Sequence, residues 1–218
     1  MTAIAQAPET APEKKRLFSA KRIYGIPIPG PEGTTVYRVR FPTDEEWSER
    51  ARRLITVRRN LGRDATHSDY KDELPIDLEL VEKLLADEDQ KLDDWTAKTI
   101  LDVLLNCDTG QFEQGEGEGY YVIEMMVLGC HVKHRLKCPT PKQAGEYNRG
   151  AFRTMGRRNT LEIRLPLEPS GELWSQLLIS VDGYENDGEV PIIHKRAALD
   201  EMIGLIQNKV QSGVDPEG

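Results

Sequence analysis

The sequence predicts an α+β protein made of two copies of one unit, each a β-hairpin followed by two or three helices. The main observation is an internal repeat, because the stretch Val36 to Asn60 returns as Val132 to Asn159. Each copy begins with alternating apolar and polar residues, the period of a strand, and continues through Pro-Thr into residues with helical spacing. The repeat is too long for a solenoid, and two copies are too few for one. Two similar domains or one pseudo-symmetric domain remain as alternatives.

The repeated strand has one apolar face and one basic face, which predicts that one side packs on a core and the other meets solvent. The residues of the apolar face are Tyr37, Val39 and Phe41 in the first copy and His134, Leu136 and Cys138 in the second. The residues of the basic face are Arg38 and Arg40 in the first copy and Arg135 and Lys137 in the second.

A hairpin partner precedes the strand in both copies. The residues 18–29 are typical of an extended segment, and the Gly-Pro-Glu-Gly run at 30–33 is a turn signal. In the second copy, an apolar run at 120–127 is followed by Leu-Gly and by the strand over 130–138. Both copies therefore predict an antiparallel hairpin.

A helix start follows each strand. Thr43 with Glu46, and Thr140 with Gln143, have the spacing of a capping box, in which the two side chains satisfy backbone N–H groups of the first turn. Pro141 then takes the first helical position, where its missing N–H costs nothing. We expect helices over about 44–61 and 141–155.

Further helices are expected over 77–86, 93–105, 172–181 and 194–210, with a possible strand over 160–165. Leu74-Pro75-Ile76 with its helix resembles Leu165-Pro166-Leu167 with its own. The predicted organisation is a disordered tail over 1–15, the first unit over 16–107, an acidic glycine-rich linker over 108–119, the second unit over 120–210 and a C-terminal tail over 211–218.

Composition indicates a polar, water-compatible chain. Of its 218 residues, 38% are hydrophobic and 30% are charged. No apolar run approaches the ~20 residues needed to span a bilayer, so no membrane partner is expected. Three cysteines at irregular spacings argue against a disulfide scaffold and favour a reducing compartment.

Charge is segregated along the chain, although the net charge is −8. Residues 38–63 hold eight arginines and four acids, residues 64–118 hold four lysines and seventeen acids, and residues 135–164 hold eight basic residues and two acids. Either these regions neutralise one another within the fold, or the basic faces bind an acidic partner.

Three sequence features resemble a metal site, a phosphate-binding loop and catalytic residues, but each is better explained by a structural role. Cys130, His131, His134 and Cys138 resemble a metal-ligand cluster, but strand residues 130 and 138 are too far apart for one zinc ion. The glycines of 115–119 are interrupted by glutamates that would repel a phosphate. None of the four histidines lies in a recognisable catalytic motif. We therefore expect no enzyme activity, no metal and no cofactor.

The basic residues are the remaining candidates for a binding site. Nucleic-acid binding uses such side chains together with stacking aromatics, yet aromatics make up only 6% of this acidic chain. A protein partner is the first hypothesis and nucleic acid the alternative. The candidate partner-binding residues are Arg38, Arg40, Arg53, Arg58, Arg59, Arg135, Lys137, Arg157 and Arg158.

The string YRVRFPTDEEWSERARRLITVRRNLGR, followed by an acidic helical segment, resembles tail assembly chaperones of tailed bacteriophages and prophages over residues 34–105. The resemblance implies a non-enzymatic assembly or structural factor of tail morphogenesis that binds a tail tube or tape-measure protein. It also implies a place in the bacterial host cytoplasm, or in the virion. It carries over no functional residues, and it leaves the oligomeric state open.

Overall fold

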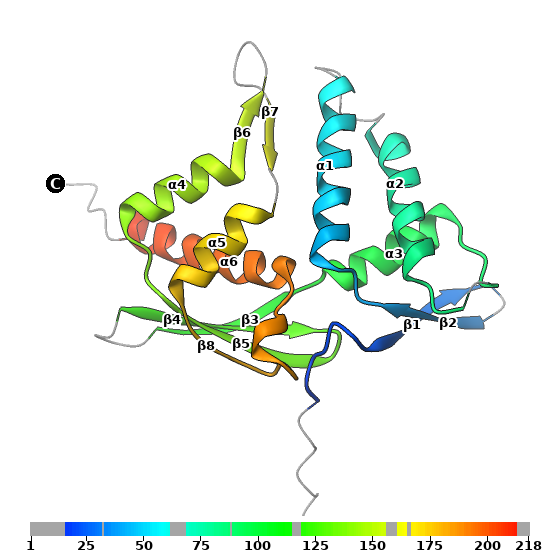
Figure 1. Cartoon of the computed structure of the whole chain (residues 1–218), viewed down its shortest axis with the longest axis horizontal. Helices are drawn as coiled ribbons and strands as arrows, with labels where there is room; N and C mark the ends of the chain where they lie inside the picture. Colours follow the sequence, from blue (N-terminus) through cyan, green and yellow to red (C-terminus); the bar gives the residue numbers. More distant parts are fainter. Residues whose placement is uncertain are drawn as a thin grey trace, which may run out of the picture.

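The protein is α+β, as predicted (Figure 1). The computed structural model describes residues 16–31, 33–61, 69–87, 89–114, 119–155, 161–164 and 167–212. The first half contains β1 (Ile23–Gly30), β2 (Gly33–Arg40), α1 (Asp44–Leu61), α2 (Asp69–Leu84) and α3 (Asp94–Leu105). The second half contains β3 (Asp108–Gln114), β4 (Tyr120–Val127), β5 (Cys130–Lys137), α4 (Pro141–Ala151), β6 (Phe152–Met155), β7 (Leu161–Arg164), α5 (Glu168–Leu177), β8 (Leu178–Asp182) and α6 (Ile192–Ser212).

The two hairpins have the same length and register. Ile23 pairs with Arg40 at the open end of the first hairpin, and Tyr120 pairs with Lys137 at the open end of the second. Every strand has eight residues, and equivalent strands begin at the same separation along the chain. Each hairpin leads into a helix and then into two more helices. The repeat therefore extends from the sequence to the order of the elements.

The capping boxes form in both halves, as predicted. The backbone N–H of Thr43 donates to Glu46 Oε2 at 2.9 Å, and the N–H of Glu46 donates to Thr43 Oγ1 at 3.2 Å. The corresponding distances for Thr140 and Gln143 are 3.0 and 3.2 Å. These reciprocal bonds fix where α1 and α4 begin.

The hairpins differ in what lies beside them. The carbonyl oxygens of Val36 and Arg38 accept hydrogen bonds from Gln90 and Ala86, so the backbone polar groups of these two residues of β2 face away from β1. The backbone groups of their partners in β1 face the opposite, outer edge of the hairpin. Pro27, which pairs with Val36, has no N–H to donate at that edge. Prolines thus protect the outer edge of β1 from a further strand.

The corresponding edge of β4 has no proline and pairs with β3, giving a four-stranded antiparallel sheet in the order β3-β4-β5-β8. The prediction of a linker over 108–119 is therefore wrong for Asp108–Gln114. The physical reason for this difference is that the unpaired backbone N–H and C=O groups along the edge of β4 pair with a third strand, whose polar, glycine-containing sequence carries no strand pattern of its own. The four residues 115–118 lie outside the description.

Three predicted helices also differ clearly from the structure. The helix predicted over 172–181 is α5, Glu168–Leu177, and residues 178–182 form β8 instead, because they pair with the free edge of β5. Helix α2 begins at Asp69 and contains Pro75, although the pattern indicates a start near 77. Proline inside a helix costs ~3 kcal/mol, and burial of Leu80, Val81 and Leu84 in the core offsets that cost. Helix α4 ends at Ala151, and β6 pairs with β7 where the sequence predicts continued helix.

The α-helices lie on one side of the β1–β2 sheet and of the four-stranded sheet (Figure 1). Helix α3 contacts β1, and α6 contacts β4, so the last helix of each half covers the hairpin of that half. Buried apolar residues from both halves form one continuous cluster, with Phe18, Phe41 and His194 where the halves meet. This continuity favours one pseudo-symmetric core over two separate ones.

An N-terminal arm, residues 16–22, runs between the two sheets before β1 begins (Figure 1). Within the described ranges, no helix is long and apolar enough to cross a membrane. The predicted tail over 1–15 lies outside these ranges, as do residues 213–218 of the tail predicted over 211–218, whereas Gln211 and Ser212 of that tail belong to α6.

Candidate functional site

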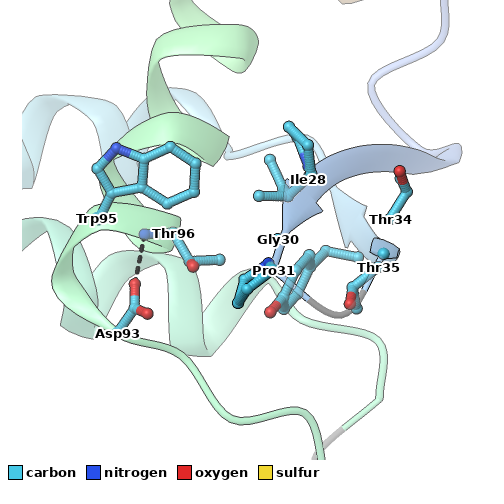
Figure 2. Close-up of a pocket in the computed structure, with 11 residues that line it drawn as sticks. Ile28, Gly30, Pro31, Thr34, Thr35, Asp93, Trp95 and Thr96 are labelled. Carbon is cyan, nitrogen blue, oxygen red and sulfur yellow. Dashed lines mark hydrogen bonds between the residues drawn. The ribbon is translucent and has the colours of Figure 1, made fainter.

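A groove of about 830 Å³ lies between the tip of the β1–β2 hairpin and the beginning of α3 (Figure 2). The hairpin contributes Ile28, Pro29 and Tyr37 to its lining, and α3 contributes Trp95 and Thr96. Figure 2 shows the Trp95 indole standing beside Ile28 across this groove. The groove therefore combines the exposed Trp95 indole with polar groups from Thr34, Thr35 and Asp93.

Trp95 is exposed because it does not lie on the buried face of α3. That face is a stripe that consists of Ala97, Ile100, Leu101 and Leu104, at the spacing of one helix face. Trp95 precedes the stripe and is 59% exposed, whereas the other two tryptophans are 2% and 4% exposed. An exposed indole beside a groove has the character of a contact residue, because tryptophan gains strongly from burial at interfaces.

Asp93 holds the α3 end of the groove in place. Its Oδ1 accepts a hydrogen bond of 2.7 Å from the backbone N–H of Thr96, which makes it the N-cap (Figure 2). The hydrogen bond from the Thr96 backbone lowers the pKa of the Asp93 carboxyl. Asp93 is therefore a negative group with a structural partner, and it fixes the position of Trp95 next to it.

The predicted basic face of β2 meets acidic residues of the same chain. Arg38 Nη1 lies 3.4 Å from Asp87 Oδ1. Arg40 makes two bonds of 2.6 and 2.7 Å to the two carboxylate oxygens of Glu46, and this hydrogen bonding lowers the pKa of Glu46 to about 2. The Arg38–Asp87 contact favours the interpretation that the charged segments neutralise one another, whereas Arg40 and Glu46 both belong to the segment 38–63.

The remaining candidates fall into three groups. Arg53 lies 2.7 Å from Glu79, and the Arg135 guanidinium lies 4.0 Å from the centre of the Tyr120 ring. Lys137 is exposed at the end of β5. The side chains of Arg58, Arg59, Arg157 and Arg158 lie outside the described part. Of the five candidates whose side chains the structure describes, none lines the groove beside Trp95.

The strand interpretation of the Cys/His run is confirmed. Cys130 and His134 are fully buried on one face of β5, and the His131 imidazole contacts Glu124 at 3.1 Å. In the described ranges, no group of three or more His, Cys, Asp or Glu side chains could hold a metal ion. Burial raises the pKa of the Cys107 and Cys130 thiols, which disfavours the nucleophilic thiolate.

A buried hydrogen-bond chain joins four rings in the second half. Trp174 Nε1–H donates to His134 Nδ1 at 3.0 Å, so His134 carries its proton on Nε2 and donates to the Tyr184 hydroxyl at 2.8 Å. Tyr184 then donates to His194 Nδ1 at 3.2 Å. Burial lowers the pKa of His134 and of His194 to about 3, so both imidazoles stay neutral and serve the packing of the core.

Sequence reasoning missed Trp95, although a signal was present: a tryptophan outside the apolar stripe of an amphipathic helix. It also missed the ring chain, because Tyr184 lies in a polar loop and reaches His134 only through the fold. Comparisons with protein-family models, with curated proteins and with solved structures find no match for this chain.

Proposed function

We propose that this chain is a non-enzymatic protein-binding factor of a tailed phage or prophage, acting in the assembly of the tail. The observation that carries the protein-binding part is the groove beside Trp95, an open hollow with a 59% exposed indole at its wall. The phage assignment rests on the resemblance of residues 34–105 to tail assembly chaperones. The proposed partners are tail tube or tape-measure proteins, met in the host cytoplasm and, if the complex persists, in the virion.

The contacts of the basic residues support a protein partner over nucleic acid. Phosphate binding needs guanidinium groups that can exchange solvent for phosphate oxygens. Arg38, Arg40 and Arg53 contact carboxylates of the same chain, which would have to be displaced first. A groove with an exposed tryptophan at its wall instead suits contact with a side chain of another protein, because tryptophan is enriched in protein–protein interfaces.

The test is affinity capture of the tagged full-length chain from phage-infected or prophage-induced cells, with identification of what is bound. The wild-type chain is compared with Trp95→Ala and with the matched control Ile179→Ala, which truncates an exposed side chain on β8. We expect a tail protein to be captured by the wild type and the control and lost with Trp95→Ala. Capture of nucleic acid alone, or of the same protein by all three, would contradict the proposal.

A further inference from the structure

The second half of the chain shows what occupies the position that is a groove in the first half. The two hairpins align residue for residue, so each groove residue of β2 has a counterpart in β5. The corresponding pairs are Thr34 and His131, Thr35 and Val132, and Tyr37 and His134. In the helices that cover the hairpins, Trp95 corresponds to Ile192, since each follows the start of β2 or β5 at the same separation.

The counterparts are covered, whereas the groove residues are open to solvent. Val132 is fully buried, whereas Thr35 is exposed. Ile192, which lies against Gly171 of α5, is 8% exposed, whereas Trp95 is 59% exposed. The same surface therefore belongs to the core in the second half and meets solvent in the first.

Two residues of the loop after β8, Gly183 and Tyr184, cover the counterparts on β5. A Cβ on Gly183 would collide with the His131 carbonyl oxygen and lie 2.9 Å from the Val132 Cα, so only glycine lets the loop run this close to the strand. Tyr184 is 6% exposed, and its hydroxyl lies 2.8 Å from His134 Nε2. A glycine against the strand backbone and a buried tyrosine ring beside it therefore close this position.

The first half has a shorter connection where the second half has this loop. Between Leu85, which pairs with β2, and the start of α3, the connection is residues 86–93. Between Leu178, which pairs with β5, and the start of α6, it is the longer run 179–191. The shorter connection meets β2 through the Gln90 side chain, which donates a hydrogen bond of 3.1 Å to a carbonyl of that strand. It thus leaves the position at the hairpin tip open as the groove.

We infer that the groove beside Trp95 binds a segment of a partner protein in which glycine is followed by tyrosine. The glycine lies against the backbone of Thr34, and the tyrosine ring enters between Tyr37 and Trp95. The Tyr37 hydroxyl stands at the position of His134 and can donate to, or accept from, the incoming hydroxyl. This inference rests on the proposed function and adds the chemistry of the segment that the partner supplies.

The probe is a fluorescently labelled peptide with the loop sequence of residues 179–187, ISVDGYEND, titrated into the full-length chain and followed by anisotropy. We expect saturable binding that weakens roughly tenfold or more with Trp95→Ala, as truncation of a central aromatic contact does. The matched control Val103→Ala truncates an exposed side chain of the same helix outside the groove, and it should bind as the wild type does.

Two altered peptides test the segment itself, with the substitutions made in the peptide and the chain left unchanged. Gly183→Ala places a Cβ against the strand backbone and Tyr184→Ser removes the ring, so each peptide should bind at least tenfold more weakly. Circular dichroism checks that each variant of the chain is folded.

Absence of saturable binding, equal binding of the three peptides, or equal binding to Trp95→Ala would overturn the inference. Concentration-dependent self-association that is lost in Trp95→Ala would overturn it too, because a second copy would then fill the groove.

The two proposals fail separately. If affinity capture yields a Trp95-dependent tail protein but the peptide does not bind, the function stands and the segment chemistry is wrong. If the peptide binds but affinity capture yields no tail protein, the chemistry of the groove stands and the assignment to tail assembly is wrong.

Discussion

Asp44, at the start of α1 in the first half, accepts a 2.9 Å hydrogen bond through Oδ1 from the backbone N–H of Ile192, at the start of α6 in the second half. A helix start leaves its first N–H groups without partners, and a carboxylate there also interacts favourably with the helix dipole. In the first half the equivalent helix carries its own cap, Asp93. The first half therefore supplies the capping side chain for α6 of the second half, and the two halves join at this helix end.

We expect Asp44→Ala to lower the free energy of unfolding by about 1 kcal/mol, the usual cost of losing a capping side chain. Asp44→Asn keeps an oxygen acceptor and should recover most of that loss. Chemical denaturation of the three proteins measures both differences. Equal stability of Asp44→Ala and the wild type would show that the bond contributes nothing.

Phe18 should be a major source of stability although it lies in the N-terminal arm. It is 1% exposed, and its ring packs edge-on against Phe41 of the first half at 5.2 Å. Phe18→Ala should cost about 3–5 kcal/mol, because it removes buried surface and leaves a cavity. Leu17→Ala is the control, since Leu17 is 37% exposed and should cost well under half as much. A loss below about 1 kcal/mol for Phe18→Ala would contradict the packing of the arm.

The free energy of unfolding should decrease as the pH is lowered from about 6.5 toward 3. The pKa of His134 and of His194 is about 3 in the folded chain, against 6.5 for the unperturbed imidazole. Between these values the unfolded chain binds more protons, so folding loses about 1.4 kcal/mol per pH unit for each histidine. Above about 6.5 this contribution is fully present.

Unfolding free energies at pH 5, 6 and 7 measure this effect. Glu46 and Glu79 have their pKa lowered to about 2 by hydrogen bonds from Arg40 and Arg53, so their contributions are lost only below about 4.5. The ring resonances of the two buried histidines should also stay constant from pH 5 to 8. Titration of either ring within that range would contradict its neutral, buried state.

The two capping boxes allow a matched comparison. Glu46 also pairs with Arg40, whereas Gln143 fills the same position in the second half without a charge. Glu46→Gln should keep the capping bonds and cost less than about 1 kcal/mol, since the ion pair is partly exposed. Glu46→Ala and Gln143→Ala both lose the side-chain bond to the threonine N–H, while Thr43 and Thr140 still accept from the helix, and each should cost about 0.5–1.5 kcal/mol. Denaturation at low and high salt separates the two effects, and only the Glu46 difference should depend on salt.

Local patterns in the sequence predict local structure well in this chain. The alternation of Val39 and Leu136 with basic neighbours predicts the buried strand faces, and the Thr43 and Thr140 boxes predict where two helices begin. These features depend on residues a few positions apart, whose geometry follows from the backbone period alone. The buried position of His134 follows from the same pattern together with its place in the repeat.

The interactions between distant segments could not be read in this way. The β3 strand owes its place to the free edge of β4, and the Asp44–Ile192 bond depends on how the two halves pack. The pairing of Arg38 with Asp87 was one of two open interpretations, because charge counts do not say which residues meet. The groove forms from the hairpin and α3, which are far apart along the chain.

The intrinsic fluorescence of the chain tests the binding role of the groove most directly. Trp47 and Trp174 are buried, so the emission at long wavelength comes from Trp95. On titration with the protein recovered by affinity capture, we predict a blue shift of the emission that saturates with the binding curve, as the indole leaves water. Binding of that protein with no change in the Trp95 emission would contradict the docking site proposed for this groove.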